Sequence, residues 1–151
     1  MRIEGDYLLP LQPQAAWNLL LNTDVLSRAM PGCQSLIPIG PDQYEVRMKM
    51  AISSIQGLFA GKIRIADQNP PSSYRLLIDS QGKLGFVRGG GLLTLVADGD
   101  STRVHILGEV QVGGLVASVG ERMLDMTTKM IIKRFFNSLE AEAKGLAERR
   151  P

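Results

Sequence analysis

Cysteine and histidine are almost missing from this sequence of 151 residues, which contains only Cys33 and His105. A single cysteine excludes an intrachain disulfide, and two potential ligands far apart in the sequence leave little from which to build a zinc or haem site. His105 shares a strand face with Arg103 and Glu109 that should meet solvent, and no base lies near Cys33 in the sequence. We therefore expect no metal ion and no catalytic centre at either residue.

Strong net charge and long apolar runs are also lacking. The 17 lysine and arginine residues nearly balance the 15 aspartate and glutamate residues, and a net charge of +2 is too small to predict a nucleic-acid partner. No run of 18 apolar residues predicts a membrane-spanning helix, and residues 1–6 lack the basic-then-apolar pattern of a signal peptide. With 44% apolar and 21% charged residues, we expect one globular cytoplasmic domain.

What the sequence does contain is a series of segments in which apolar and polar residues alternate, the pattern of half-buried β-strands. The clearest of them spans residues 44–52, where Tyr44, Val46, Met48 and Met50 alternate with charged residues. The other predicted strands are residues 3–9, 34–39, 57–66, 74–80, 86–96 and 103–112. The short connections predict an antiparallel meander that hides one face and exposes the other.

Helical patterns occupy the two gaps that the strands leave. One short helix is predicted over residues 13–21, with Pro13 at its first position. A second is predicted over residues 23–29, capped by Asn22 and ended by Pro31. Residues from 113 to the end predict one helix of about 35 residues. The predicted fold class is therefore α+β, with a curved seven-stranded antiparallel sheet wrapped around a long C-terminal helix and two short helices between strands 1 and 2.

The long helix carries two apolar stripes when the residues are placed at 100° intervals from Val116. The first comprises Val116, Val119, Met123, Met126, Met130 and Ile131, and the second comprises Ile132, Phe135, Phe136, Leu139, Ala143 and Leu146. Both stripes fit an ordinary core. Because methionine is flexible and polarizable, the first also fits the roof of a cavity for an apolar ligand.

A cavity between the curved sheet and the helix would be enlarged by inward glycines such as Gly61, Gly89 or Gly91. The run 89–91 itself indicates a bend, a bulge or a close approach of another backbone. Arg88 fits either a solvated edge or a polar contact at the cavity mouth, and Thr127 fits either a bond to its own helix or contact with a ligand. The candidate ligand-binding residues are Met48, Met50, Phe59, Ile63, Leu76, Arg88, Met123, Met126, Thr127 and Met130.

Three motifs, in order along the chain, resemble the CoxG family of carbon monoxide dehydrogenase proteins. They are residues 26–33 (LSRAMPGC), residues 57–63 (GLFAGKI) followed by Asp67, Pro70, Pro71 and Tyr74, and residues 85–89 (GFVRG). The opening segment 5–21, with Trp17 in its helix, fits as well, so that the resemblance covers residues 1–145. It implies the helix-grip fold of START-like (SRPBCC) domains over residues 1–147, followed by a short tail at 148–151.

The resemblance implies a non-catalytic accessory protein of molybdenum-containing CO dehydrogenases and related hydroxylases. The family is linked to attaching the enzyme to the inner face of the cytoplasmic membrane and to handling a quinone, with no covalently bound cofactor. Its longer members carry a C-terminal extension that reaches the membrane. In this chain, which stops at Pro151, the candidate lipid contact is an amphipathic end that would otherwise pack on the sheet. It comprises Phe135, Phe136, Leu139 and Leu146 with Lys144, Arg149 and Arg150.

The sequence leaves three alternative functions to compare with the structure. The first is a carrier for a quinone or isoprenoid lipid. The second is an assembly or docking factor for the oxidoreductase, with a closed core and no ligand. The third is an enzyme, since START-like folds also host cyclases, and it requires an ionisable group on the hidden face. That face is apolar in sequence, so we expect the protein not to be an enzyme.

Overall fold

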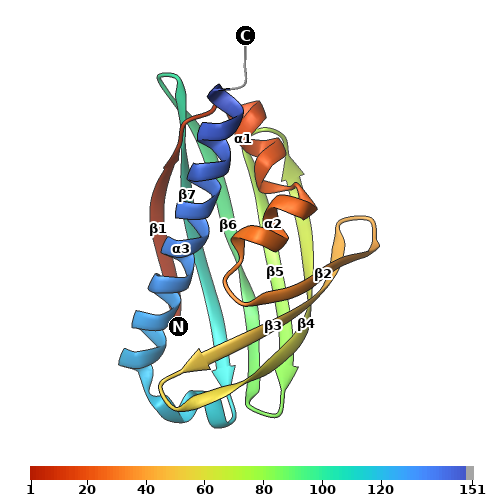
Figure 1. The fold of residues 1–151 in the computed structure, drawn as a ribbon, viewed down its shortest axis with the longest axis vertical. Coiled ribbons are helices and arrows are strands. Elements are labelled where there is room, and N and C mark those ends of the chain that lie inside the picture. Colours follow the sequence, from red (N-terminus) through yellow and green to blue (C-terminus); the bar gives the residue numbers. More distant parts are fainter. Residues whose placement is uncertain (149–151) are drawn as a thin grey trace.

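The alternating segments form seven antiparallel strands in the computed structural model, which describes residues 1–148 (Figure 1). The strands are β1 (Arg2–Leu9), β2 (Cys33–Gly40), β3 (Gln43–Ile52), β4 (Ile55–Asn69), β5 (Ser73–Gly82), β6 (Gly85–Asp98) and β7 (Ser101–Gly113). They pair in the order β1-β7-β6-β5-β4-β3-β2, so that β1 and β2 are the two edges of one sheet. This confirms the predicted meander.

The chain crosses from one sheet edge to the other through two short helices, α1 (Pro13–Leu20) and α2 (Thr23–Ala29). Pro13 occupies the first turn of α1, where its missing N–H is not needed. The side chain of Asn22 accepts a hydrogen bond of 3.1 Å from the backbone N–H of Val25, as predicted for the cap of α2. Helix α1 buries Trp17 and Leu20 against the sheet.

Strand β4 extends further than the sequence predicted. The alternation suggested that it ends at Ala66, but it continues to Asn69, and only residues 70–72 form the turn to β5. The pairing of β4 with β5 shifts between Ala66 and Asn69, and Asp67 takes a positive φ of 50°. Because of this irregularity, β4 stays paired with β5 beyond Ala66, where the alternation of apolar and polar residues ends.

The predicted C-terminal helix is interrupted. A short 3₁₀ helix, η1 (Leu115–Val119), precedes α3 (Glu121–Glu148), and the two are separated by Gly120 with φ of 95°. That conformation is readily available only to glycine and cannot continue an α-helix. The prediction of one helix from residue 113 was therefore wrong at its start, and residues 149–151 of the predicted tail lie outside the described residues.

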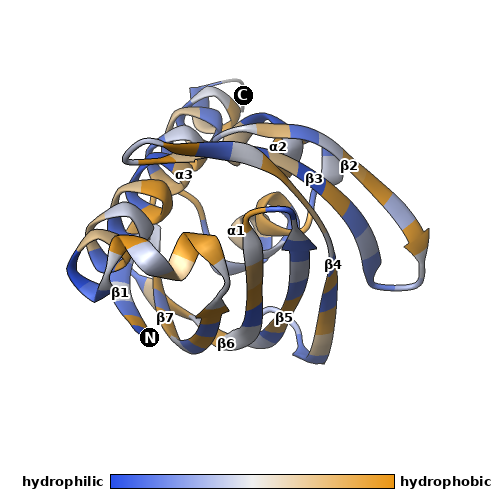
Figure 2. Cartoon of the chain, turned by 90° about the horizontal axis from the view of Figure 1, so that it is seen from below, coloured by the Kyte–Doolittle hydropathy of each residue, from blue (hydrophilic) through white to orange (hydrophobic). Residues whose placement is uncertain are grey.

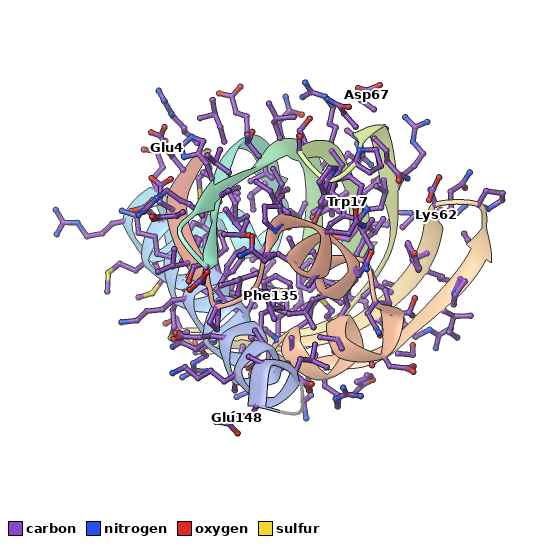
Figure 3. The ribbon with its side chains drawn as sticks, turned by 90° about the horizontal axis from the view of Figure 1, so that it is seen from above. Glu4, Trp17, Lys62, Asp67, Phe135 and Glu148 are labelled. Carbon is purple, nitrogen blue, oxygen red and sulfur yellow. The ribbon has the colours of Figure 1, made fainter. Side chains whose placement is uncertain are left out.

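Helix α3 lies across the open side of the curved sheet, as the view from below shows (Figure 2). Its C-terminal half buries Phe136, Leu139 and Ala143, so most of the second predicted stripe packs as expected. Figure 3 shows Trp17 and Phe135 toward the interior and Glu4 pointing outward. The sheet and α3 together enclose the space in which the candidate site lies.

Candidate functional site

A cavity of about 360 Å³ lies between the concave face of the sheet and α3. Its lining residues come from all seven strands, α1, α2, η1 and α3, and most are aliphatic or aromatic. The volume falls in the range of about 300–1,000 Å³ that is typical of small-molecule sites. The curved sheet and its covering helix therefore leave room for a ligand, which is one of the two interpretations that the sequence left open.

The cavity separates two groups of buried residues. The larger group joins α1, α2, the C-terminal half of α3 and the adjoining strand ends, and contains Trp17, Tyr74 and Leu139. The smaller group consists of Ile52, Phe59 and Val116 with the side chains packed on them. Ile63, Leu76 and Phe135 on the larger group, and Met50, Val87 and Leu124 on the smaller one, line the cavity. A gap replaces the continuous core that a domain of this size usually has.

Glycines shape the floor of the cavity where β6 and β7 pair. Gly91 and Gly108 lie opposite each other and both line the cavity. A Cβ atom on Gly108 would lie 2.9 Å from the Cα atom of Gly91, so a side chain there would force the strands apart. A Cβ atom on Gly90 would collide with the carbonyl oxygen of Leu76. The run 89–91 thus marks close backbone approach, and the unshifted pairing on both sides of β6 rules out a bulge.

The polar side chains on the cavity wall are neutral. Among residues 1–148, no carboxylate, amine, guanidinium or imidazole side chain lines the cavity, and the polar side chains are hydroxyls. They belong to Tyr44, Tyr74, Ser80, Thr127 and Thr128. Ser80 donates to the carbonyl oxygen of Val87 at 3.3 Å, and Thr128 to the sulfur of Met1 at 3.7 Å. This wall suits an uncharged, largely apolar molecule, because a buried charge would have no partner.

Six of the ten predicted ligand-binding residues line this cavity. They are Met48, Met50, Phe59, Ile63, Leu76 and Thr127. The remaining four, Arg88, Met123, Met126 and Met130, do not line it. The structure places these six on one inner surface, and whether they bind a ligand stays a prediction.

Arg88 lies on the outer face of the sheet. Its guanidinium pairs with Asp79 on the neighbouring strand at 3.1 Å and lies 4.7 Å from the ring centroid of Phe86. Both charged side chains are at least half exposed. Of the two interpretations of Arg88, the structure supports the solvated position and not the cavity mouth, although β6 lies inside the sheet and not at its edge.

The three methionines of α3 point away from the sheet. Met123, Met126 and Met130 are 37%, 59% and 43% exposed, on the face opposite to the lining residues Leu124 and Ile131. Helical angles counted from Val116 run across Gly120, where the chain leaves the helical conformation. Counted from Glu121, the inward positions form one continuous stripe, and the methionines span an arc of about 60° on the outside.

Other lining residues escaped the sequence argument. Leu124 and Thr128 belong to the true inner stripe of α3 and could have been found by starting the helix after Gly120. Tyr74, Ile78 and Ser80 alternate with solvent-facing residues on β5, on the same face as Leu76. Their alternation was visible, but nothing in the sequence distinguished cavity lining from ordinary core.

His105 and Cys33 have the ordinary environments that were expected. His105 faces solvent, with its Nδ1 atom 3.0 Å from an oxygen of Asp6 on the adjacent strand. Burial raises the pKa of the Cys33 thiol, which reduces the fraction of reactive thiolate. Within residues 1–148, no three His, Cys, Asp or Glu side chains are placed to hold a metal ion together.

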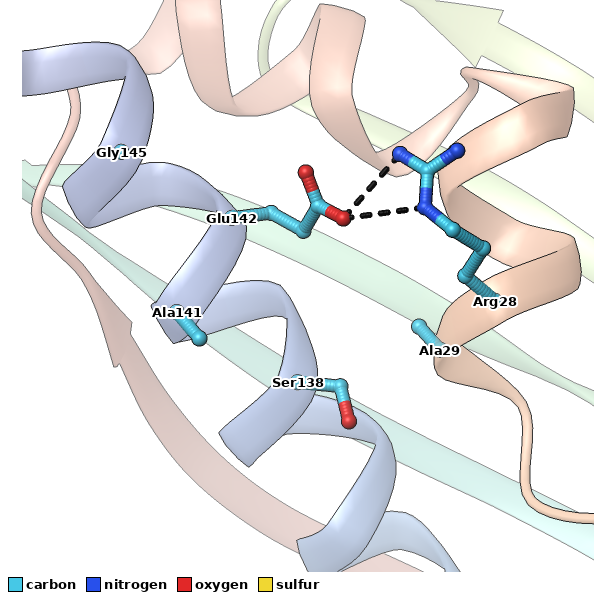
Figure 4. A pocket seen from close by; sticks show the side chains of 6 residues that line it. All are labelled: Arg28, Ala29, Ser138, Ala141, Glu142 and Gly145. Carbon is cyan, nitrogen blue, oxygen red and sulfur yellow. Dashed lines mark hydrogen bonds and ion pairs between the residues drawn. The ribbon is translucent and has the colours of Figure 1, made fainter.

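A shallow groove lies outside the cavity, between α2 and α3 (Figure 4). Arg28 spans it, with its Nη2 and Nε atoms 3.0 and 3.1 Å from the same carboxylate oxygen of Glu142. The guanidinium is 59% exposed, so this pair contributes at most about 1 kcal/mol. It joins α3 to the helix that carries the cavity-lining residue Leu26.

No helix within residues 1–148 is both long and apolar enough to cross a membrane. Helix α3 has 28 residues, but charged side chains recur along its outer face. Its apolar residues are concentrated instead on the inner stripe that faces the sheet and the cavity.

Solved structures with this fold include a conserved protein from Geobacillus kaustophilus, with a TM-score of 0.92, 30% sequence identity and 96% coverage of each chain. A START superfamily protein from Mycobacterium smegmatis has a TM-score of 0.74 at 11% identity, covering 96% of this chain and 98% of its own. The Zhui aromatase/cyclase from a Streptomyces strain has a TM-score of 0.70 at 11% identity, covering 95% and 93%. These last two likenesses show the START-like fold alone.

The sequence comparisons give the family directly. No curated protein matches the chain significantly. The model of one family, that of the carbon monoxide dehydrogenase protein CoxG, matches residues 5–144 and so spans nearly the whole chain. The motifs at residues 26–33, 57–63 and 85–89 all fall within the matched region. The chain therefore belongs to the carbon monoxide dehydrogenase CoxG family.

Proposed function

We propose that this protein is a non-catalytic accessory protein that binds an uncharged apolar molecule of the quinone or isoprenoid type. It would serve a molybdenum-containing oxidoreductase of the CO dehydrogenase type, as the family name suggests. The observation that carries the proposal is the cavity, which is of ligand size, has an apolar wall and holds no charged side chain from residues 1–148.

The size of the cavity favours a ligand over a closed core. A dry cavity of 360 Å³ would cost on the order of 9 kcal/mol at about 24 cal/mol per Å³. That cost is comparable with the whole stability of a typical domain, about 5–15 kcal/mol. A ligand that fills the space would recover about 25 cal/mol for each Å² of apolar surface it buries, less the entropy of association. The docking-factor alternative with a closed core is therefore disfavoured.

The cavity wall also favours binding over catalysis. Acid–base catalysis uses a group that titrates near the working pH within reach of the substrate. No carboxylate, amine or imidazole side chain from residues 1–148 lines this wall, and burial raises the pKa of Tyr74 further above its usual value. This supports the accessory role, although the same fold occurs in an aromatase/cyclase.

The first test is to identify what the purified protein carries. Native mass spectrometry should show an added mass at close to one per chain, and mass spectrometry of an organic extract should identify it as a quinone or isoprenoid. Added menaquinone should bind to any apo protein at the same stoichiometry. A clean apo mass that remains apo with added menaquinone would contradict the proposal and favour docking without a ligand.

The amphipathic end of α3 packs on the sheet, which is the interpretation that the sequence favoured over contact with lipid. Phe136 and Leu139 of the predicted amphipathic end are buried, and Phe135 packs against the same core. Arg149 and Arg150 lie outside the described residues. Apart from Leu146, which is 40% exposed, the apolar side chains of this end therefore face the sheet and not lipid.

The N-terminal half of α3 offers a better surface for membrane contact than its C-terminal end. We call this surface the methionine face, and it consists of Met123, Met126 and Met130. Four exposed cations flank it on the same outer side of the helix, namely Arg122, Lys129, Lys133 and Arg134. An exposed apolar stripe flanked by cations is typical of helices that lie on anionic lipid. We propose that this face makes the peripheral contact with the inner face of the cytoplasmic membrane.

Replacing Met126 with glutamate should weaken binding to vesicles of phosphatidylcholine with phosphatidylglycerol about tenfold, because it removes apolar contact and adds a repelled charge. The measurement is co-sedimentation at low and high salt. Leu58→Glu is the matched control, since Leu58 is 55% exposed on the outer face of β4, away from α3. Equal loss in both variants, or no loss in either, would contradict the role of the methionine face.

A further inference from the structure

Tyr74 is a polar residue at an unusually buried position. Only 3% of its surface is exposed, and it projects from β5 toward the interior, where the ring of Trp17 meets it edge-on at 5.3 Å between centroids. Its cross-strand neighbour on β6 is Leu93, which is also buried. The surroundings of the ring are therefore apolar, yet the side chain ends in a hydroxyl.

That hydroxyl forms no hydrogen bond with any residue from 1 to 148, and desolvation alone accounts for the shift of its pKa. A sealed hydroxyl without a partner would cost about 1–3 kcal/mol. However, no side-chain oxygen or nitrogen in the described part of the chain is both sealed and unpaired. The Tyr74 hydroxyl therefore keeps some accessible surface, and Tyr74 is one of the residues that line the cavity.

The hydroxyl of Thr127 also forms no side-chain hydrogen bond within residues 1–148, whereas the other three wall hydroxyls differ from that of Tyr74. Ser80 and Thr128 already donate to protein atoms, and Tyr44 is only partly buried. Thr127 lies one turn from Leu124, at the end of the cavity that adjoins the smaller buried group. Tyr74 belongs to the larger group and so offers its free donor at the opposite end.

We propose that Tyr74 orients the ligand by donating a hydrogen bond to an uncharged acceptor, such as a carbonyl oxygen, at the end of the ligand that adjoins the larger buried group. The apolar remainder of the ligand then lies along the cavity toward Phe59 and Leu124. This inference rests on the proposed function and adds the position and polarity of the ligand. Burial raises the pKa of Tyr74, so the hydroxyl keeps its proton at neutral pH. An anionic acceptor is disfavoured because no cationic side chain from residues 1–148 lines the wall, and the ammonium group of Met1 already donates to the carbonyl oxygen of Val110 at 2.7 Å.

Two probes of similar shape separate the hydrogen bond from apolar burial. Menadione, a naphthoquinone, carries carbonyl oxygens, and methylnaphthalene carries no acceptor. The measurement is quenching of Trp17, the one tryptophan, or displacement of a bound dye, on the whole purified chain. In Tyr74→Phe, menadione should bind about tenfold more weakly, and methylnaphthalene should bind as it does to the original protein.

Tyr7→Phe is the matched control, since it removes the hydroxyl of a tyrosine that stacks on Phe136 and does not line the cavity, and it should leave both affinities unchanged. Thermal unfolding of Tyr74→Phe should occur at or above the original temperature, because no intramolecular hydrogen bond is lost. Unchanged menadione affinity in Tyr74→Phe, or equal weakening of both probes, would overturn the role of Tyr74 while leaving the proposed function intact. If the original protein bound neither probe, the proposed function would fail together with this inference.

Discussion

Replacing Ile78 with tryptophan is expected to weaken quinone binding roughly a hundredfold, because the indole would fill the space that the ligand needs and displace on the order of 100 Å² of apolar contact. Ile78 lines the cavity from the middle of β5. Its cross-strand neighbours are Ile63 and Gly89, so the β6 side offers no side chain to clash with the indole. The measurement is titration with menadione, followed by Trp fluorescence or calorimetry.

Leu77→Trp is the control for this substitution. Leu77 is the next residue on β5, partly buried on the opposite face of the sheet, so its replacement adds the same ring outside the cavity. Ile78→Trp should also unfold at an equal or higher temperature in the absence of ligand, because it fills a void. Full quinone affinity in a folded Ile78→Trp protein would show that the ligand binds elsewhere.

Replacing Leu139 with alanine should lower the free energy of unfolding by about 3–5 kcal/mol. Leu139 has no exposed surface and lies on α3 between Phe136 and Ala143, where the helix packs against the larger buried group. The substitution leaves a gap at the contact that holds the helix on the sheet. Urea unfolding, followed by circular dichroism, measures the change.

Leu146→Ala makes the same chemical change two turns later on α3, where the side chain is 40% exposed. It should cost less than about 1 kcal/mol. A similar loss in both variants would mean that α3 does not depend on this contact. The difference between the two costs therefore measures how firmly α3 is held against the sheet.

The fold could be predicted from the sequence because the signals were local and repeated. Alternation in segments such as 44–52 specified both the strand and the face that it buries, and Asn22 and Pro13 marked helix starts. The START-like order of elements and the family followed from the motifs, and the comparisons confirm both.

The site was predicted only in part, for two physical reasons. The angular position of a residue on a helix is found by adding about 100° for each residue from the helix start. Because the chain leaves the helix at Gly120, angles counted from Val116 placed Met123, Met126 and Met130 on the inner face, whereas the structure exposes them. A cavity is an absence of contact between elements distant in the sequence, and alternation cannot distinguish it from filled core. The Tyr74 hydroxyl has no hydrogen-bond partner among residues 1–148. The lack of a partner, like the cavity, is decided by the three-dimensional arrangement and leaves no signal in the sequence.

The division of the interior into two buried groups has a consequence for cooperativity. The smaller group joins the β3–β4 hairpin, η1 and the first turns of α3, and few large side chains hold it together. Local opening of that end therefore needs less free energy than opening of the end that contains Trp17 and Leu139. A molecule in the cavity touches both groups, so its binding free energy adds directly to the cost of local opening. Occupancy thus converts two loosely coupled units into one.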